Sequence, residues 1–512
     1  MLTKVGQEEG KYTYCLIALL VAFVAFHLVK SHFMGLQEDE ANWWMQIRHL
    51  QPGYFFHPPF IVYELFVITR IFGDGPVALR VGSLFFTTGS LLLVHRVCLE
   101  MFGDRRGAFF ALQDPPFIFF SLLTLLLTWR MLSTSRAWYW YPIGLSAGMM
   151  LLCKLQAGLF LFSFLLLLAS RKNRHWFRRK EPYLALAIAA LLFARTFAWY
   201  ALHHFEPITY QAENRIGFLE NGPLGYLYFV LEHVGKEMLV LSPFVYLASI
   251  FGLVRGGRAY FSRQGERDQR FILLFCMSAP TILFFTLTGG PPNWAIPGHF
   301  IALLAAAGAL PPLLEHARRP FLQLHGSTAF VLLCLVAPLA LTAATLVITV
   351  GDHVQNEYLA LAERLQEVRE RLPEEEVYLA SPYYFVPSEI SYYDRGDFAG
   401  YAILFQVYEH VVVTAGGEGY TPWTSSEELV GKDIVFVDAE MNPDGYDTPL
   451  SFWSRKLAPY FESVEEPEVF SYRKWVNDER RYFIFVCHGF KGPDPGMNRK
   501  GELREYVSGR PD

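Results

Sequence analysis

Long apolar runs recur through the first 350 residues, and they constrain the fold more than any other feature of this sequence. A helix needs about 20 apolar residues to cross the roughly 30 Å hydrocarbon core of a bilayer. Runs close to that length lie at residues 12–30, 77–98, 115–132, 138–152, 155–169, 183–204, 238–254, 271–288, 296–314 and 328–350. The pattern predicts a mainly α, polytopic membrane protein with about ten or eleven spans, the first of them retained and not cleaved as a signal peptide.

The composition agrees with a membrane protein. Of the 512 residues, 52% are hydrophobic and 18% are charged, whereas soluble proteins carry about 25% charged residues. An ordinary cytosolic enzyme is therefore excluded. The net charge of -5 gives no sign of a nucleic-acid partner. The six cysteines form no CxxC pair, so neither a disulfide framework nor a zinc site is indicated.

Basic loops set the expected orientation, because loops rich in lysine and arginine stay on the cytoplasmic side. Such loops contain residues 104–106, 171–180, 255–270 and 318–319. The loop at residues 31–76 and the tail at residues 351–512 are then expected outside. We accordingly divide the chain into a membrane domain, residues 1–350, and an extracytoplasmic domain, residues 351–512. In the loop, Glu64 and Arg70 interrupt an apolar stretch that is expected to lie along the membrane interface.

The tail changes character and predicts a small soluble α/β domain. Residues 354–372 indicate an amphipathic helix whose apolar side carries Leu359, Leu361, Leu365, Val368 and Leu372. Short strands are expected at residues 377–379, 411–413, 434–437 and 482–486, with a helix start at residues 425–429. The tail contains no Gly-rich phosphate loop and no nucleophile elbow. It is more consistent with a substrate-binding or stabilising lobe than with a second active site.

The loop after the first apolar run carries the most informative motifs. It contains Asp39-Glu40-Ala41, the pair Trp43-Trp44, then Gly53-Tyr54 and the rigid turn His57-Pro58-Pro59. Acidic residues at a membrane surface are usually solvated loop charges. A carboxylate held at the lipid–water boundary can alternatively act as a general base on an acceptor hydroxyl or amine.

The order of these motifs resembles the first extracytoplasmic loop of bacterial GT-C membrane glycosyltransferases of the family 39 type. These enzymes are related to dolichyl-phosphate-mannose–protein mannosyltransferases and to lipid A aminoarabinose transferases. Later matches keep the order of that family: Phe72-Gly73-Asp74, Arg80, Asp114-Pro115-Pro116, Leu152-Cys153-Lys154 and residues 292–297. The resemblance implies a GT-C helical fold in the bacterial inner (plasma) membrane.

The same resemblance implies a reaction and its partners. A sugar would pass, with inversion, from a polyprenyl-phosphate donor to an extracytoplasmic acceptor, which is lipid A, another glycan or a protein. No cofactor is certain, and a divalent metal ion is left open. Asp39 would be the catalytic base, with Glu40 orienting it or contacting a metal. Further roles would fall to Arg80 and Lys154 at the donor phosphate, and to His57, Asp114, Asn293 and Trp294 at the substrates.

Arg195 is a candidate on its own account, without the resemblance. It lies inside the apolar run 183–204, where an ionisable residue is costly and so suggests a function, here binding of the donor phosphate. The alternative is that its side chain extends to the outer interface, because His204 is close in sequence.

Two departures from the family pattern bear on activity. Phe56 replaces the aspartate expected before His57, and only residues 107–113 separate Arg106 from Asp114. A helical segment of that length cannot cross the bilayer. We therefore expect Asp114 to lie near the cytoplasmic side, with the run 115–132 leading outward, unless neighbouring segments take a different path through the membrane. This leaves an inactive scaffold as one alternative to the transferase, and a transporter as a weaker one.

Overall fold

The computed structural model describes most of the chain. The described residues are 2–102, 114–205, 208–209, 212, 222–262, 268–315, 354–372, 376–383, 385–393, 398, 400–407, 410–414, 429–439, 453–454, 457–473 and 479–492. They form two compact units. The first contains residues up to 28, residues 51–64 and the described residues from 80 to 315; the second contains residues 29–50, 65–79 and those from 354 onward. The boundary expected at residue 350 lies outside the described residues.

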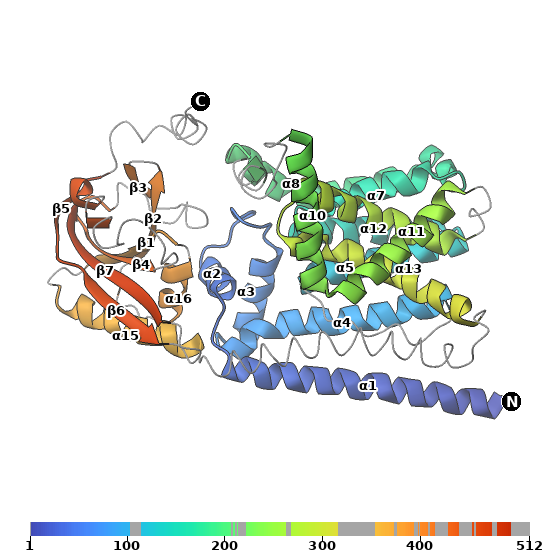
Figure 1. The fold of residues 1–512 in the computed structure, drawn as a ribbon, viewed down its shortest axis with the longest axis horizontal. Coiled ribbons are helices and arrows are strands. Elements are labelled where there is room, and N and C mark those ends of the chain that lie inside the picture. The colour runs from blue at the N-terminus through green and yellow to red at the C-terminus, as the bar shows by residue number, and fades with distance from the viewer. Residues whose placement is uncertain are drawn as a thin grey trace. The chain divides into compact units, whose positions relative to one another are not determined.

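The first unit is helical, as the sequence predicts (Figure 1). Three helices are shared with the second unit: α1 (Leu2–Phe33) and α3 (Phe60–Phe72) end in it, and α4 (Pro76–Phe102) begins in it. The other elements are α5 (Pro115–Thr134), η1 (Ala137–Tyr139), α6 (Trp140–Cys153), α7 (Ala157–Ala169), η2 (Arg174–Arg178), α8 (Glu181–Leu202), α10 (Gly222–Leu241), α11 (Pro243–Phe261), α12 (Gln269–Thr288), η4 (Pro292–Ala295) and α13 (Ile296–Glu315).

Several of these helices suit a membrane by length and composition. Within the described residues, four are long and apolar enough to cross one, namely α4, α5, α8 and α12. Two bent helix pairs, residues 20–46 and residues 224–261, bring the total to as many as six. The expected ten or eleven spans stay a prediction, and the run 328–350 lies outside the described residues.

The apolar run 238–254 is not one helix, contrary to the sequence prediction. Instead α10 ends at Leu241 and α11 begins at Pro243, with a bend of 111° between them. Proline disfavours helical backbone in the residue before it, and Ser242 is non-helical, with φ 68° and ψ 145°. The Ser242 hydroxyl accepts a hydrogen bond from the Val245 amide, so the break is also a start signal for α11.

Neighbouring helices of the first unit form both antiparallel and parallel pairs. α5 and α6 are antiparallel, because Thr124 donates to Ser146 near their middles and Asp114 meets Lys154 at their ends. α4 and α5 are parallel. Near their beginnings the Phe86 and Phe119 rings lie 5.4 Å apart, and near their ends Glu100 pairs with Arg130.

This parallel arrangement corrects the expectation for Asp114. The residue lies at the end of the helices where α4 begins, not at the end where α4 stops near Phe102. The run 115–132 therefore leads in the same direction as α4. The expectation assumed that the residues after Arg106 would have to cross as a helix; residues 103–113 lie outside the described part of the chain.

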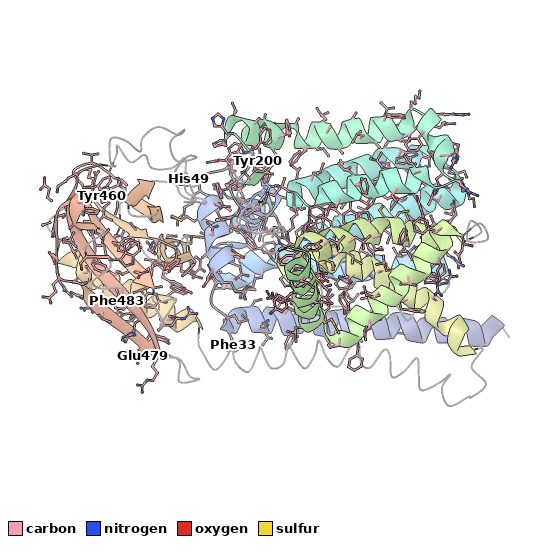
Figure 2. The ribbon with its side chains drawn as sticks, turned by 45° about the horizontal axis from the view of Figure 1, so that its top comes forward. Phe33, His49, Tyr200, Tyr460, Glu479 and Phe483 are labelled. Atoms are coloured by element: carbon pink, nitrogen blue, oxygen red, sulfur yellow. The ribbon has the colours of Figure 1, made fainter. Side chains whose placement is uncertain are left out.

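We call this end of the first unit the site end, where α4 and α5 begin and where α6 and α8 stop. α6 and α8 are parallel and very close, since Gly144 lies against Ala185 and Gly148 against Ala189; small residues permit such an approach between helices. Tyr200, near the end of α8, is buried here (Figure 2). α12 starts at the opposite end, where Arg270 donates to the Met101 carbonyl, so its last turn reaches the site end.

The second unit is built on a mixed sheet with the order β3-β2-β1-β4-β7-β5, and β6 pairs with the rest of the outer edge of β7 (Figure 1). Its elements are α2 (Glu38–Gln46), α15 (Val354–Glu370), β1 (Val377–Ser381), α16 (Phe385–Tyr393), β2 (Gly400–Val407), β3 (His410–Thr414), β4 (Asp433–Ala439), η5 (Ala458–Tyr460), β5 (Phe461–Val464), β6 (Glu468–Arg473) and β7 (Glu479–Phe490). β1 is parallel to β2 and β4, and the other pairings are antiparallel.

Two apolar cores lie on the two faces of this sheet. α15 and α16 pack on one face through Leu361, Leu365 and Ile390. The other face is aromatic and includes Tyr460 and Phe483, both labelled in Figure 2.

The α/β character of the tail and its four predicted strands are confirmed, whereas β2, β5 and β6 were not predicted. Leu359 was placed wrongly, because its side chain is 39% exposed and Tyr358, 3% exposed, faces the core instead. Of the expected helix start at residues 425–429, residues 425–428 lie outside the described residues, and Leu429 lies in a turn.

The first loop contributes α2 and its neighbours to this second unit. The Trp44 ring on α2 meets Tyr392 on α16 edge to face, with centroids 5.0 Å apart. The Tyr392 hydroxyl donates to the Asp74 carbonyl, 3.0 Å away. These contacts join the segments 29–50 and 65–79 to the tail.

Candidate functional site

The part of the first loop that belongs to the first unit is fixed against α8 at the site end. Thr196 donates to the Pro52 carbonyl over 2.7 Å. Gly53 faces the Trp199 ring so closely that a Cβ there would lie 2.7 Å from the Trp199 Cε3 atom. Only glycine permits this approach. The Gly-Tyr motif thus has a structural reason, and the Tyr54 hydroxyl accepts from the Gln51 amide.

The His57-Pro58-Pro59 turn leads directly from this loop into α3. The His57 Nδ1 atom lies 3.0 Å from the Pro58 carbonyl oxygen, and its ring lies 5.8 Å from that of Tyr54. At the departure from the family pattern, Phe56 packs edge to face on Phe55. His57 is therefore held beside the site end by the geometry of the turn.

Asp114 and Lys154 are two predicted site residues that form an ion pair. The Lys154 ammonium donates to Asp114 Oδ2 over 2.6 Å, with side chains 24% and 36% exposed. Asp114 precedes the first turn of α5 with φ 52°, a conformation that aspartate tolerates better than most residues. Its carboxylate is stabilised at the helix N-terminus, and Lys154 follows the last turn of α6 in an extended conformation.

Glu64 is a buried carboxyl that the sequence showed only as an interruption of an apolar stretch. Neither of its side-chain oxygens has a hydrogen-bond partner in the described part of the chain. The carboxyl lies against Gly82 of α4. Both Glu64 and Asp114 lie within electrostatic range of Cys153, the neighbour of Lys154. Burial raises the pKa of Glu64 to about 8, so the acid is neutral at pH 7.

Gln156 is a second polar side chain that the sequence did not single out. It lies in the turn between α6 and α7, two residues after Lys154. Its amide oxygen and nitrogen are both buried and lack a partner among the described residues. A buried amide without hydrogen bonds is costly. The Gln156 amide can therefore donate to, and accept from, a polar ligand that enters this turn. Only its position beside Lys154 could have drawn attention to it.

The other predicted residues of the first unit, Arg80, Arg195, Asn293 and Trp294, also lie at the site end. Arg195 is exposed on α8, one residue before Thr196, and its charge acts on the Tyr63 hydroxyl. Arg80 lies in the first turns of α4 and is half-buried. Asn293 and Trp294 form part of η4, and the Trp294 ring lies 5.4 Å from Phe285.

Asp39 and Glu40 belong to the second unit, in the first turn of α2. Asp39 is exposed. Glu40 has a structural task there, because its Oε2 atom accepts from the Gln37 amide over 3.0 Å. This contact completes the reciprocal capping pattern at a helix start. The described residues contain no group of three or more His, Cys, Asp or Glu side chains that could hold a metal ion; a divalent ion stays a prediction.

Comparison with known proteins connects this arrangement to membrane glycosyltransferases. The dolichyl-phosphate-mannose–protein mannosyltransferase family matches residues 56–199, which include the His57 turn, Asp114 and Lys154. Lipid A galacturonosyltransferase RgtD of Rhizobium johnstonii is 22% identical over 386 residues, covering 69% of this chain and 76% of that protein.

Solved structures extend the likeness over nearly the whole chain. ArnT from Cupriavidus metallidurans without ligand gives a TM-score of 0.53 at 13% identity, covering 92% of this chain and 98% of that one. The chain has the GT-C fold. The same ArnT bound to undecaprenyl phosphate gives 0.51 at 14% identity, covering 94% and 99%. The resemblance to bacterial GT-C glycosyltransferases related to lipid A-modifying enzymes is thus confirmed.

Proposed function

We propose that this chain is a multi-pass glycosyltransferase of the bacterial inner membrane that moves a sugar from a polyprenyl-phosphate donor to a lipid A-type acceptor. The observation that carries the proposal is the Asp114–Lys154 pair at the site end, the end at which the loop 51–59 is held against α8. A polyprenyl donor is supported by ArnT bound to undecaprenyl phosphate, and a lipid A acceptor by RgtD. A protein acceptor is the alternative that the description of the matching family names, and another glycan has no such support.

The proposed reaction is a single displacement at the anomeric carbon. An acceptor oxygen forms the new bond to that carbon while the bond from the carbon to the phosphate oxygen breaks. The proton of the acceptor passes to the Asp39 carboxylate, and the bonding electrons leave on the polyprenyl phosphate. The configuration at the anomeric carbon is inverted. A positioned general base contributes roughly 10²–10⁴-fold to such a step.

Positive charge at the site end suits the leaving phosphate. Lys154 is already oriented by Asp114, and its other ammonium hydrogens can reach a phosphate oxygen. Arg80 and Arg195 supply two more cations at the same end. Charge that develops on the phosphate as the bond breaks is stabilised most by cations that are already in place. His57, Asn293 and Trp294 are proposed as substrate contacts.

The scaffold alternative loses its main argument. It rested on an Asp114 displaced to the far end of the helices, whereas Asp114 lies at the site end with Lys154. Phe56 remains a departure from the family pattern and has no proposed role in the chemistry.

We place the tail on the extracytoplasmic side because Arg318-Arg319 precede the last apolar run. Alkaline phosphatase fused after residue 512 should therefore be active, and an inactive fusion would contradict this orientation.

The direct test is transfer in detergent, where a transporter would show no activity. Purified full-length protein is mixed with lipid A and with undecaprenyl phosphate carrying galacturonic acid, aminoarabinose, mannose or glucose. Mass spectrometry should show lipid A heavier by one sugar residue with one of these donors. The variant Lys154→Ala should reduce this product strongly, whereas Lys236→Gln, an exposed lysine of α10 paired with Glu232, should not. Absence of product with all four donors would overturn the proposal.

A further inference from the structure

A second group of ionisable side chains is buried between α10, α11, α12 and α13. Its centre is Glu237 of α10, which is fully buried. The Nε2 atoms of His233 and His299 lie 3.5 and 3.7 Å from the two oxygens of the Glu237 carboxylate. Thr286 donates to the same carboxylate from 3.3 Å. Ionisable groups inside apolar helices are costly, and their retention suggests a function.

The hydrogen bonds around His299 determine where its protons lie. Ser249 has one hydroxyl hydrogen, and it donates this hydrogen to the Tyr246 carbonyl over 2.6 Å. The same hydroxyl lies 2.6 Å from His299 Nδ1, so it must accept from that nitrogen. The other ring nitrogen, Nε2, lies 3.7 Å from the Glu237 carboxylate, which is within ion-pair range but too long for a hydrogen bond.

This cluster is attached to both sides of one loop. Thr286 lies three residues before Gly289, and His299 lies four residues after Ala295. Between them run the glycines Gly289 and Gly290, both with positive φ, and the short helix η4. Glu237 therefore ties the two flanks of the loop 289–295 to the same point of α10. The loop carries Asn293 and Trp294, two residues of the candidate site.

α10 holds the loop at further points. The Tyr226 hydroxyl donates to the Leu287 carbonyl over 2.8 Å. The Phe229 ring lies directly against Gly289, at a position that a Cβ would occupy. The ring packing restrains the loop without direction, whereas the Tyr226 hydrogen bond is directional. The Glu237 carboxylate adds a hydrogen bond from Thr286 on one flank and an ion-pair contact with His299 on the other, which favour one arrangement of the two flanks over alternatives.

We propose that Glu237 is a positioning residue that holds the loop 289–295, through Thr286 and His299, in the conformation that receives the lipid-linked substrate. The role of the loop in substrate binding rests on the proposed glycosyltransferase function. The attachment of the loop to Glu237 does not rest on it, so two separate measurements are needed.

The first measurement is hydrogen exchange of the full-length protein in detergent, followed on peptides that cover residues 285–296. Glu237→Leu removes the carboxylate and should speed exchange of the loop amides about tenfold, equivalent to about 1.4 kcal/mol of local stability. Glu237→Gln should stay within about threefold of the parent, because its amide can donate to His299 Nε2 and accept from Thr286. Glu232→Gln, an exposed ion-paired residue of the same helix, is the matched control.

The second measurement uses lipid A transfer. Glu237→Leu should raise the KM for one substrate about tenfold with kcat within about threefold, the pattern of lost substrate positioning, and Glu237→Gln should restore it. If Glu237→Leu does not fold, Thr286→Val removes one flank only and replaces it in both measurements. Unchanged loop exchange would overturn the attachment, and a loss confined to kcat would overturn the positioning role. A parent protein without transfer activity would refute the proposed function while the exchange result still decides the attachment.

Discussion

Lys154 and Asp114 join the end of α6 to the beginning of α5 through a contact of 2.6 Å. The contact links Lys154, which is proposed to bind the donor phosphate, to the carboxylate of the Asp114-Pro115-Pro116 motif. The lysine side chain is long and flexible, and in this geometry the carboxylate holds it toward the site end. Because both side chains are partly exposed, an anionic ligand can approach the ammonium without first entering a closed core.

Removing the Lys154 ammonium should lower the rate of sugar transfer from the donor more than it lowers the stability of the fold. We expect Lys154→Ala to lower kcat/KM about 100-fold, since about 2.7 kcal/mol is a typical loss for a group that stabilises developing charge. Lys154→Arg should recover part of it. Asp114→Asn should have a smaller effect, because it leaves the ammonium present but less well oriented. Transfer rates measured at several donor concentrations check this, and equal rates for Lys154→Ala and the parent would contradict it.

Glu64 should make the stability of the protein depend on pH. Its pKa is about 8 in the folded state because of burial, against an ordinary value near 4.5. Between these two values the folded protein binds a proton that the unfolded chain has lost, so stability falls as the pH rises through this window. Glu64→Gln keeps the shape without the charge and should remove much of that fall.

The measurement for Glu64 is the Tm of the full-length protein in detergent from pH 5 to pH 9. The Tm of Glu64→Gln should exceed that of the parent by an amount that grows with pH. The control is Glu232→Gln, which removes an exposed carboxylate. If the two variants and the parent have parallel curves, the buried carboxyl is not the group that titrates.

Much of the fold follows from sequence, for reasons visible in particular residues. Apolar runs of span length became α4, α5, α8 and α12 because length and hydropathy alone decide such helices. The break at Ser242 was readable from Pro243 but was masked by apolar residues on both sides. The direction of α5 was not readable, because it depends on packing against α4 and not on local composition.

In the candidate site, too, local motifs predicted some residues, whereas contacts that depend on packing were not predicted. Asp114 and Lys154 could be named from their motifs, but their contact joins residues 40 positions apart. In the sequence Glu64 is visible only as a break in an apolar stretch. Its carboxyl is buried against Gly82 of α4, a contact that the local sequence does not reveal. Glu237 and His299 gave no signal at all. Glu237 is one of four ionisable residues at positions 232–237, and His299 is a single polar residue in an apolar stretch. Only the fold brings the two together.

His488 should give the sheet of the second unit a local dependence on pH. Its two ring nitrogens lie 2.7 Å from an Asp433 oxygen and 2.9 Å from a Glu465 oxygen. Burial lowers the pKa of His488, but the hydrogen bonds to Glu465 and Asp433 outweigh it and raise the pKa above 6.5. The stabilisation is therefore complete below pH 6.5 and is lost as the pH rises through the raised value.

Hydrogen-exchange protection factors of β7 residues 485–490 test this in the full-length protein. Protection should be greater at pH 6 than at pH 8.5 in the parent, by a few-fold because the ring is partly exposed. His488→Gln should show the same protection at both pH values. A decrease of equal size in this variant would assign the effect to another group.

Asp39 and Glu40 should differ sharply although they are neighbours in the first turn of α2. Asp39→Asn preserves size and removes the proposed base, so we expect kcat to fall by about 10²–10⁴-fold with the protein folded and inserted. Glu40 accepts a hydrogen bond from the Gln37 amide, and glutamine accepts the same bond in a capping box. Glu40→Gln should therefore keep kcat within a few-fold of the parent. Glu38→Gln controls for loss of one negative charge at the same helix start. Transfer by Asp39→Asn at close to the parental rate would show that this carboxylate is a solvated surface charge, and a large loss in Glu40→Gln would show that Glu40 does more than cap the helix.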